Sequence, residues 1–374
     1  MDDVIVVGGG PAGCVAGMVM ARSGLRVRLF ERAAFPREKL CGDTLNPGAI
    51  LALARIGVYP AADGLPIHGM LVTGPGSVRV EGWYPAGVIG RAIRRSVLDQ
   101  RLLQAASDAG VAVEERARVE GVVTGTRARV AGVSVQGADR RRHRMTARFV
   151  IAADGRSSRI ARALSLARYA RAPRRWAIGG YFSGVSGLSP RGEMHVRAGR
   201  YIGVAPLPGG IANVCVVTAD RSTLREPASV IAEAVAGEPE LAERFTSARL
   251  ETRPVCLGPL AVDCRIPGMP GLLLAGDAAG FIDPMTGDGL RLAIRGAELA
   301  AGECLAALAG DNPVPHVRLA IRRRQELGRK LRFNRLLRAL VGSPGAIRGA
   351  ACATRVSTWP LRQVISYVGD VTAG

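Results

Sequence analysis

The sequence has no hydrophobic run with the features of a signal peptide or a membrane-spanning helix. Residues 4–21 are largely apolar, but Asp2 and Asp3 precede them, where a secretory signal would carry positive charge. A second apolar stretch, residues 271–282, is interrupted by Asp277. A membrane-spanning helix needs about 20 apolar residues. We therefore expect a soluble cytoplasmic protein without a signal peptide or a transmembrane segment.

Cysteine is present but is not arranged in pairs. There are seven cysteines, an odd number, and no Cys-x-x-Cys motif. Cys256 and Cys264 are the closest two in the sequence, and no histidine accompanies them at the spacing of a zinc site. This usage argues against a disulfide framework. We expect reduced thiols and no bound metal.

Lysine and aromatic residues are scarce, whereas arginine is abundant. Lys39 and Lys330 are the only lysines among 51 basic residues, and the formal net charge is +20. Such a charge attracts phosphate without specificity. However, aromatic residues make up only 4% of the chain, and no basic stripe carries interleaved stacking residues. We interpret the arginine excess as compositional bias and expect no nucleic-acid partner.

The strongest functional signal is a glycine-rich segment near the start of the chain. Gly8, Gly10 and Gly13 follow an apolar strand, residues 4–7, and precede an expected helix. Gly8 permits a tight turn, Gly10 lets the backbone approach a pyrophosphate, and Gly13 lets the helix pack on the strand. The free N–H groups and the dipole of the helix N-terminus favour the phosphate charge.

An acidic residue completes this pattern. A second strand, residues 25–30, leads to Glu31 and Arg32, and Glu31 stands where a carboxylate hydrogen-bonds a ribose hydroxyl. Strand, turn, helix, strand and acid together predict a dinucleotide site. We place Pro11 and Ala12, in the first turn of the helix, in that site as well.

The rest of the chain alternates between two kinds of segment. Buried parallel strands and helices resume after short alternating strands, and a long run of antiparallel-type strands with a helix near 228–245 is inserted before residue 271. We expect an α/β fold with three parts. The nucleotide domain comprises residues 1–68, 91–167 and 265–312, the inserted antiparallel-sheet substrate domain comprises 69–90 and 168–264, and the C-terminal helical region comprises 313–374.

Three further motifs support one reading. They are Arg95-x-x-Leu98-Asp99 at the start of a helix, IAADGRSS at 151–158, and LLLAGDAAGFIDPMTGDGLRLAI at 272–294. With the glycine motif, and in this order, they resemble the FAD-dependent oxidoreductases of the para-hydroxybenzoate hydroxylase fold. Within these, the chain looks most like the geranylgeranyl reductase branch. The resemblance covers nearly the whole chain and implies a Rossmann-like FAD-binding domain and non-covalent FAD.

The resemblance also implies roles for particular residues. Gly276 and Asp277 would hold the ribityl chain. Asp154 and Gly155 would lie near the pyrophosphate, in a motif also linked to nicotinamide nucleotide use. Arg95 would lie near the cofactor, although Arg91 and Arg94 compete for that role. The turn beside the reactive ring, where a helix N-terminus favours the charge of reduced flavin, comprises Pro284, Gly287, Asp288, Gly289 and Leu290.

Lys39-Leu40-Cys41-Gly42-Asp43 resembles a segment of the reductases whose cysteine lies close to the flavin. By this likeness Cys41 and Gly42 contact the cofactor. The Cys41 thiol is a candidate catalytic proton donor to a reduced alkene, a residue that shapes the pocket, or a small apolar filler.

Some residues depart from the family patterns. Gly203 and Ala205 replace two aromatic residues of the reductases, which should open the substrate pocket and favours a bulkier ring system over a straight isoprenoid. Gly280 follows GDAA, where aromatic hydroxylases carry histidine. Trp176-Ala177-Ile178 does not match the halogenase motif, so we do not expect halogenation.

The chemistry stays open at this stage. We expect a small hydrophobic substrate and either reduction of a carbon–carbon double bond or monooxygenation, and we consider an electron carrier as a third possibility. No second glycine motif provides a nicotinamide domain, so NAD(P)H would dock transiently or a protein would deliver electrons. His195 falls in the substrate sheet, where we expect it to face solvent rather than act as a base.

The basic C-terminal helices offer two readings. Leu327, Leu331, Leu336 and Leu340 give a partial apolar face amid arginines. That face either packs on the nucleotide domain or rests weakly on an anionic membrane.

Overall fold

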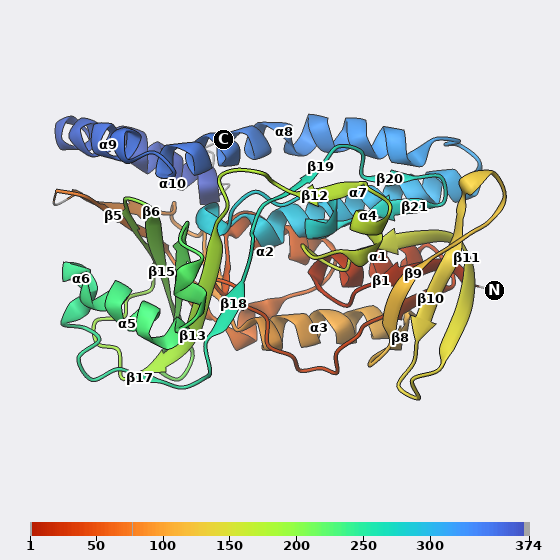
Figure 1. Cartoon of the computed structure of the whole chain (residues 1–374), viewed down its shortest axis with the longest axis horizontal. Coiled ribbons are helices and arrows are strands. Elements are labelled where there is room, and N and C mark those ends of the chain that lie inside the picture. The colour runs from red at the N-terminus through yellow and green to blue at the C-terminus, as the bar shows by residue number, and fades with distance from the viewer. Residues whose placement is uncertain (1, 77, 370–374) are drawn as a thin grey trace.

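The computed structural model describes residues 2–76 and 78–369 and confirms the predicted α/β class (Figure 1). The sheet of the nucleotide domain has the strand order β20–β21–β11–β1–β2–β8, and β9 and β10 form a hairpin that joins it at β11. Strands β21, β11, β1, β2 and β8 run parallel. The bounds are β1 Asp2–Val7, β2 Val27–Phe30, β8 Ala112–Glu114, β9 Arg118–Thr124, β10 Val130–Gln136, β11 Arg142–Ala152, β20 Gly268–Met269 and β21 Leu272–Leu274.

Both faces of this sheet are covered, which explains the continuous apolar strands. Val4 and Val6 of β1 pack against helices, whereas Ile5 and Val7 pack under the β9–β10 hairpin. The helices of the first face are α1 (Pro11–Arg22), α2 (Pro47–Arg55), α3 (Arg95–Asp108) and α7 (Gly289–Ala309). Short elements connect the layers: β3 (Thr44–Leu45), β4 (Leu65–Ile67) and β7 (Gly90–Ala92) form a small sheet, β12 (Ala167–Tyr169) pairs with β19 (Val262–Cys264), and α4 is Arg159–Ala163.

The second large sheet has the order β17–β13–β16–β15–β14–β5–β6, with β18 also pairing with β13. It is antiparallel except for one parallel pair, β5 with β14. The exception arises because β5 enters from a separate chain segment rather than through a hairpin. The bounds are β5 Gly69–Gly74, β6 Val78–Trp83, β13 Trp176–Ser183, β14 Gly192–Arg197, β15 Arg200–Leu207, β16 Ile211–Thr218, β17 Arg249–Leu250 and β18 Val255–Leu257.

Two helices cover one face of the second sheet where the sequence suggested a single helix over 228–245. Helix α5 (Pro227–Ala236) ends at Gly237, and α6 (Pro239–Ala242) starts at a proline. The break follows from residue chemistry, because glycine ends helices and proline is favoured at the first helical position.

The C-terminal region is helical, as expected. Helix α8 (Pro315–Val341) lies along α7, and α9 (Pro344–Val356) and α10 (Trp359–Gly369) extend over the second sheet (Figure 1). The leucines of α8 do not form one face: Leu327 is 2% exposed and Leu336 is 67% exposed. Within the described residues, no helix has the length and apolarity required to cross a bilayer.

Candidate functional site

The turn after β1 is held by two close backbone approaches that only glycine allows. Gly8 has a φ of +102°, and a Cβ there would lie 2.5 Å from the Ala153 carbonyl oxygen. A Cβ on Gly13 would lie 1.8 Å from the Gly8 carbonyl oxygen. Helix α1 is therefore pressed against the turn, which fixes where its N-terminus points.

Gly10 has a different surrounding. It is the N-cap of α1 and precedes Pro11. The space where a side chain would stand is open, because the atom nearest to an added Cβ is Arg37 Nη2, at 3.7 Å. The N-terminus of α1 thus presents backbone N–H groups beside an open face and next to a guanidinium, a suitable cradle for a pyrophosphate. Ala12 lies beside the GDAA motif, because a Cβ built on Gly276, the first residue of that motif, would be 2.7 Å from the Ala12 Cβ.

Glu31 closes the other side of this cradle. Its Oε2 accepts a hydrogen bond from the Gly9 N–H at 2.8 Å, and its Oε1 accepts one from the Ala33 N–H at 3.0 Å. The carboxylate is 6% exposed, and each oxygen keeps a lone pair for a ribose hydroxyl. Arg32 is exposed and points to no partner that the described residues reveal.

Sequence reasoning missed Arg37. Its Nη1 lies 3.0 Å from Asp99 Oδ2, and its Nη2 lies 3.9 Å from Glu31 Oε2 and near Gly10. The residue occurs in a loop without a motif, so only the fold brings this cation to the glycine turn.

Arg95 starts α3, as expected, and is buried in a bidentate pair. Its Nε and Nη2 donate to the two Asp99 oxygens at 2.9 and 2.8 Å. Burial opposes its charge, but Asp99 raises the Arg95 pKa above its ordinary value. The two competing arginines lie elsewhere: Arg91 donates to the Gly64 carbonyl, and Arg94 stacks over the Tyr181 ring.

Two acidic residues at strand ends face the same space. Asp154 follows β11; its Oδ2 accepts from the Arg159 N–H at 2.9 Å, and its Oδ1 is buried without a hydrogen-bond partner among the described residues. Gly155 has a φ of +78°, and an added Cβ would lie 3.7 Å from Lys39 Nζ. An unsatisfied buried oxygen beside a positive-φ glycine suits a site that a polar ligand completes.

Asp277 follows β21 at the neighbouring strand end. Gly276 has a φ of +60°, which turns the chain sharply there. Burial raises the pKa of Asp277, whereas the charges of Lys39, Arg95 and Arg156 lower it. Burial likewise lowers the pKa of Lys39. The half-buried carboxylate thus stands among cations at the mouth of the site, where it can accept hydrogen bonds from ribityl hydroxyls.

The turn before α7 is anchored on both sides. Pro284 begins a short 3-10 turn, and Asp283 ahead of it binds Arg175 at 3.0 Å and the Tyr201 hydroxyl. Gly287 has a φ of +64°, and Asp288 accepts from Asn46 Nδ2 at 2.9 Å with Lys330 Nζ 3.4 Å away. Gly289 and Leu290 then start α7, so these contacts anchor the N-terminus of the helix.

Residues 39–46 run along this whole site. Lys39 lies near Gly155, and Thr44 Oγ1 would be 3.9 Å from a Cβ on Gly287. Cys41 is half-buried and Gly42 is exposed. Burial raises the pKa of the Cys41 thiol, so the thiol is neutral near pH 7 and is not an activated nucleophile.

Asp43, which we did not single out from the sequence, is the titratable centre of this segment. It is 1% exposed and has a φ of +51°. Its oxygens accept from the Arg95 N–H at 3.2 Å and from Asn213 Nδ2 at 2.7 Å. Burial raises the pKa of Asp43 to about 6, although hydrogen bonds from Tyr181 and Asn213 oppose the rise. A buried carboxyl that titrates near neutrality can store a proton.

An apolar cavity of about 150 Å³ adjoins the turn before α7. Sheet residues form one wall and helices α8–α10 form the other. No charged side chain lines it within the described part of the chain. Its lining includes Val72, Met194, Met285, Thr286, Leu340 and Ile365.

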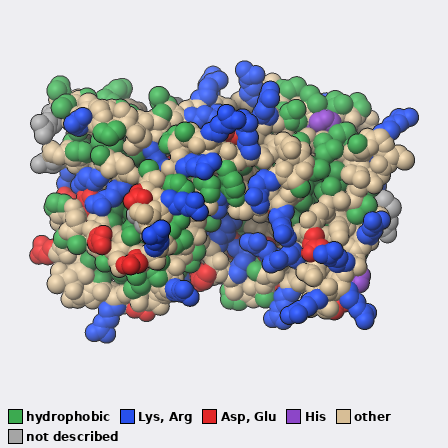
Figure 2. All heavy atoms as spheres, viewed as in Figure 1, with side chains coloured by type: hydrophobic (Ala, Val, Ile, Leu, Met, Phe, Trp, Pro, Cys, Tyr) green, Lys and Arg blue, Asp and Glu red, His purple; other side chains and the backbone are tan. Residues whose placement is uncertain are grey.

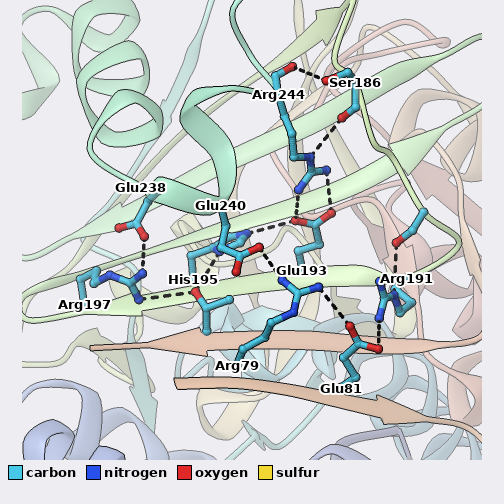
Figure 3. A network of polar contacts seen from close by, with 12 residues as sticks. Arg79, Glu81, Ser186, Arg191, Glu193, His195, Arg197, Glu238, Glu240 and Arg244 are labelled. Atoms are coloured by element: carbon cyan, nitrogen blue, oxygen red, sulfur yellow. Dashed lines mark hydrogen bonds and ion pairs between the residues drawn. The ribbon is translucent and has the colours of Figure 1, made fainter. Parts of the chain in front are cut away.

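The expectation that His195 faces solvent is wrong. Its side chain is fully buried on the opposite face of the sheet from Met194, because neighbours along a strand alternate. Nδ1 lies 2.9 Å from Thr73 Oγ1, and Nε2 lies 3.1 Å from Glu193, which Arg244 clamps with two hydrogen bonds (Figure 3). This network ties β14 to the α5–α6 side of the sheet, and of the network residues named here only Thr73 also lines the cavity.

Comparison with known proteins agrees with this geometry. Residues 1–254 match the family model described as FAD binding domain. The chain is 30% identical over 328 residues to menaquinone reductase of Mycobacterium tuberculosis, covering 80% of this chain and 75% of the relative. It is 32% identical over 327 residues to digeranylgeranylglycerophospholipid reductase 1 of Methanopyrus kandleri, covering 83% and 82%.

A solved structure shares the fold. The myxobacterial chondrochloren halogenase superposes with a TM-score of 0.82 at 24% identity, covering 90% of this chain and 82% of that one. The open cradle at Gly10, the unpaired oxygen of Asp154 and the half-buried carboxylate of Asp277 all fit FAD. The chain therefore belongs to the FAD binding domain family and is an FAD-dependent oxidoreductase.

Proposed function

We propose that this oxidoreductase reduces a carbon–carbon double bond in a neutral, largely apolar small molecule. The observation that carries the proposal is the uncharged cavity bounded by Met285 and Thr286, which belong to the turn at the start of α7. Support comes from two relatives of about 30% identity that are both called reductases.

The reaction adds two electrons and two protons across the double bond. When bound and reduced, FAD would be the source of the hydride for one carbon. The other carbon needs a proton. Asp43 has a pKa of about 6 and lies two residues from Cys41, whose thiol is neutral near pH 7 because burial raises its pKa. We therefore assign Cys41 as the proton donor and Asp43 as the residue that positions and resupplies it.

The remaining site residues hold the cofactor in this proposal. Gly8, Gly10 and Gly13 shape the pyrophosphate cradle, Arg37 adds a cation to it, and Glu31 takes the ribose. The N-terminus of α7, at Gly289, would lie beside the flavin ring and would favour its negative charge when reduced. NAD(P)H docking at the surface, or an electron-carrying protein, would reduce the flavin again.

Rapid mixing tests the reaction type. Reduced enzyme is mixed anaerobically with a candidate alkene, and separately with air plus the same compound. Reoxidation by the alkene without oxygen, with a product heavier by two hydrogen atoms, supports reduction. A transient flavin hydroperoxide with an oxygenated product would instead establish a monooxygenase. Reoxidation by proteins alone would establish an electron carrier.

A further inference from the structure

One row of residues crosses the second sheet at the level of the candidate site. Strand pairing places these residues side by side, so their side chains share one face of the sheet. The row passes from β5 through β14, β15 and β16 to β13, and its members are Val72, Met194, Gly203, Cys215 and Gly179.

The middle of this row is open. A Cβ built on Gly203 would meet no atom closer than 4.0 Å, where the Cys215 and Glu193 carbonyl oxygens lie. Gly203 is partly exposed although β15 is an interior strand, whereas Ile202 and Val204, which face the other side, are 0% and 2% exposed. Space therefore exists above Gly203 on the site face alone.

The two ends of the row differ in chemistry. Val72 and Met194 line the apolar cavity under α8–α10. At the other end, Cys215 Sγ donates to the Cys41 carbonyl at 3.3 Å, and Leu40 covers Gly179 so closely that a Cβ there would lie 2.4 Å from Leu40 Cδ1. The gap at Gly203 thus lies between the apolar cavity and the segment that carries Cys41.

One polar atom in the cavity has no partner. Thr286 is 5% exposed and lines the cavity, and its hydroxyl makes no hydrogen bond within the described residues. A buried unsatisfied hydroxyl is costly unless a ligand or water completes it. Its position next to Met285 places it at the end of the cavity nearest to the α7 turn.

We propose that Gly203 determines the substrate class by admitting a ring-bearing head. The planar head lies over Gly203 between Met194 and Cys215, an apolar tail extends under α8–α10, and the Thr286 hydroxyl donates to a neutral carbonyl of the head. This inference rests on the proposed function for the reaction that the bound molecule undergoes, whereas the binding geometry is argued independently of it. The cavity that receives the tail has no charged side chain in its described lining, which fits an apolar tail.

Binding of two simple probes to the FAD-loaded full chain tests this. The first is 2-methyl-1,4-naphthoquinone, a ring with carbonyls and no tail; the second is geranylgeraniol, a tail without a ring. Dissociation constants are measured anaerobically from the perturbed visible spectrum of the bound flavin, without turnover. Variants are Gly203→Phe, with Gly203→Leu as a second filling variant, Gly203→Ala as the matched small control, and Thr286→Val.

We expect Gly203→Phe to weaken quinone binding at least about tenfold and to change geranylgeraniol binding by less than about twofold. Gly203→Ala should match wild type, because 4.0 Å is ordinary contact distance. Thr286→Val should weaken quinone binding by roughly fivefold, the loss of one neutral hydrogen bond. Each variant must keep its FAD.

Three results would overturn the inference. They are an equal effect of Gly203→Phe on the binding of both probes, no effect on the binding of either probe, and a failure of the wild-type protein to bind the quinone. The proposed function fails in a different way. Suppose that quinone binding depends on Gly203 as expected, but the reduced enzyme transfers hydride to no alkene. The proposed reaction is then wrong, while the role of Gly203 in binding is supported.

Discussion

Charged side chains in the site are paired with one another. Arg37 and Arg95 both bind Asp99, while Lys39 lies near Asp277. Paired charges cost less to bury than isolated ones. This pairing reduces the energetic cost of burying several cations at the site. It leaves the oxygens of the half-buried Asp277 available to a neutral polyol.

Asp277→Ala should weaken FAD binding by about 2 kcal/mol, or roughly thirtyfold in dissociation constant, because a charge-assisted hydrogen bond is lost. The measurement is flavin absorbance after gel filtration, followed by titration of the apoprotein. Asp311→Ala, at an exposed position beyond α7, is the matched control. Full yellow colour in the Asp277 variant would contradict the assigned role.

Asp43 should make stability depend on pH. Its pKa is about 6 in the folded protein against an ordinary value of 3.8, so between these values the folded state binds more protons than the unfolded state. The stabilisation is complete below about pH 4 and is lost as pH rises through 6. The stability of wild type relative to Asp43→Asn should fall by up to about 3 kcal/mol from pH 4 to pH 7.

Urea unfolding at several pH values, with FAD in excess, measures that difference. Asp311→Asn, at an exposed position beyond α7, serves as the control and should show no such trend. A constant difference between wild type and Asp43→Asn across the range would show that Asp43 does not titrate there.

At the scale of elements, glycines set how closely helices approach strands. Gly13 lets α1 meet the turn after β1, and Gly82 lets α10 meet β6, since a Cβ on Gly82 would lie 2.6 Å from Ile365 Cγ2. The first contact builds the cofactor cradle, and the second closes the apolar cavity. Neither helix could keep its position with a larger residue beneath it.

Gly13→Ala should abolish FAD retention or destabilise the protein by at least about 2 kcal/mol, because its Cβ has no room beside the Gly8 carbonyl. Gly349→Ala, in helix α9 with nothing within 4 Å, is a matched helical control and should stabilise by about 0.5 kcal/mol. Thermal unfolding and flavin content are the measurements. A yellow Gly13→Ala protein of normal stability would refute the packing argument.

Gly82→Val should push α10 away from β6 and open the cavity. We expect faster proteolysis within residues 344–369 and stronger fluorescence of an apolar dye, with FAD content unchanged. Gly121→Val on β9, where nothing lies within 4 Å of an added Cβ, should behave as wild type. Equal proteolysis of the two variants would mean that α10 does not depend on this contact.

At the scale of the whole molecule, the arginine excess is distributed rather than focused. Basic side chains spread over the visible face and surround a hollow near its middle (Figure 2). At the corner between α9 and α10, Val356 is 90% exposed and Trp359 is 65% exposed. Positive charge with exposed apolar residues near the cavity-covering helices supports weak contact with an anionic membrane as a proposal.

Vesicles of anionic and neutral lipid test it. Binding to anionic vesicles should be measurable at low salt and lost at about 0.5 M salt, where screening shortens to a few ångström. Trp359→Ala should reduce binding at low salt, whereas Tyr59→Ala, another exposed aromatic (69%), should not. Sedimentation without any dependence on salt or lipid charge would end the membrane proposal.

The sequence by itself determined the cofactor and the fold class. The glycines after β1, the acid after β2 and the GD motif after β21 are local patterns, because turns, helix starts and strand ends depend on neighbouring residues. The family and FAD followed from them and are confirmed. The domain boundaries and the individual site residues stay predictions.

Tertiary structure alone decided several contacts that no sequence motif marks. Asp43 meets Asn213 across 170 residues, and Arg37 reaches the glycine turn from a loop without a motif. His195 is buried, although we expected this residue of the substrate sheet to face solvent. These contacts depend on which strands pair and which helices cover them. A one-dimensional pattern shows which face a residue shares with its neighbours, but it does not show what packs against that face.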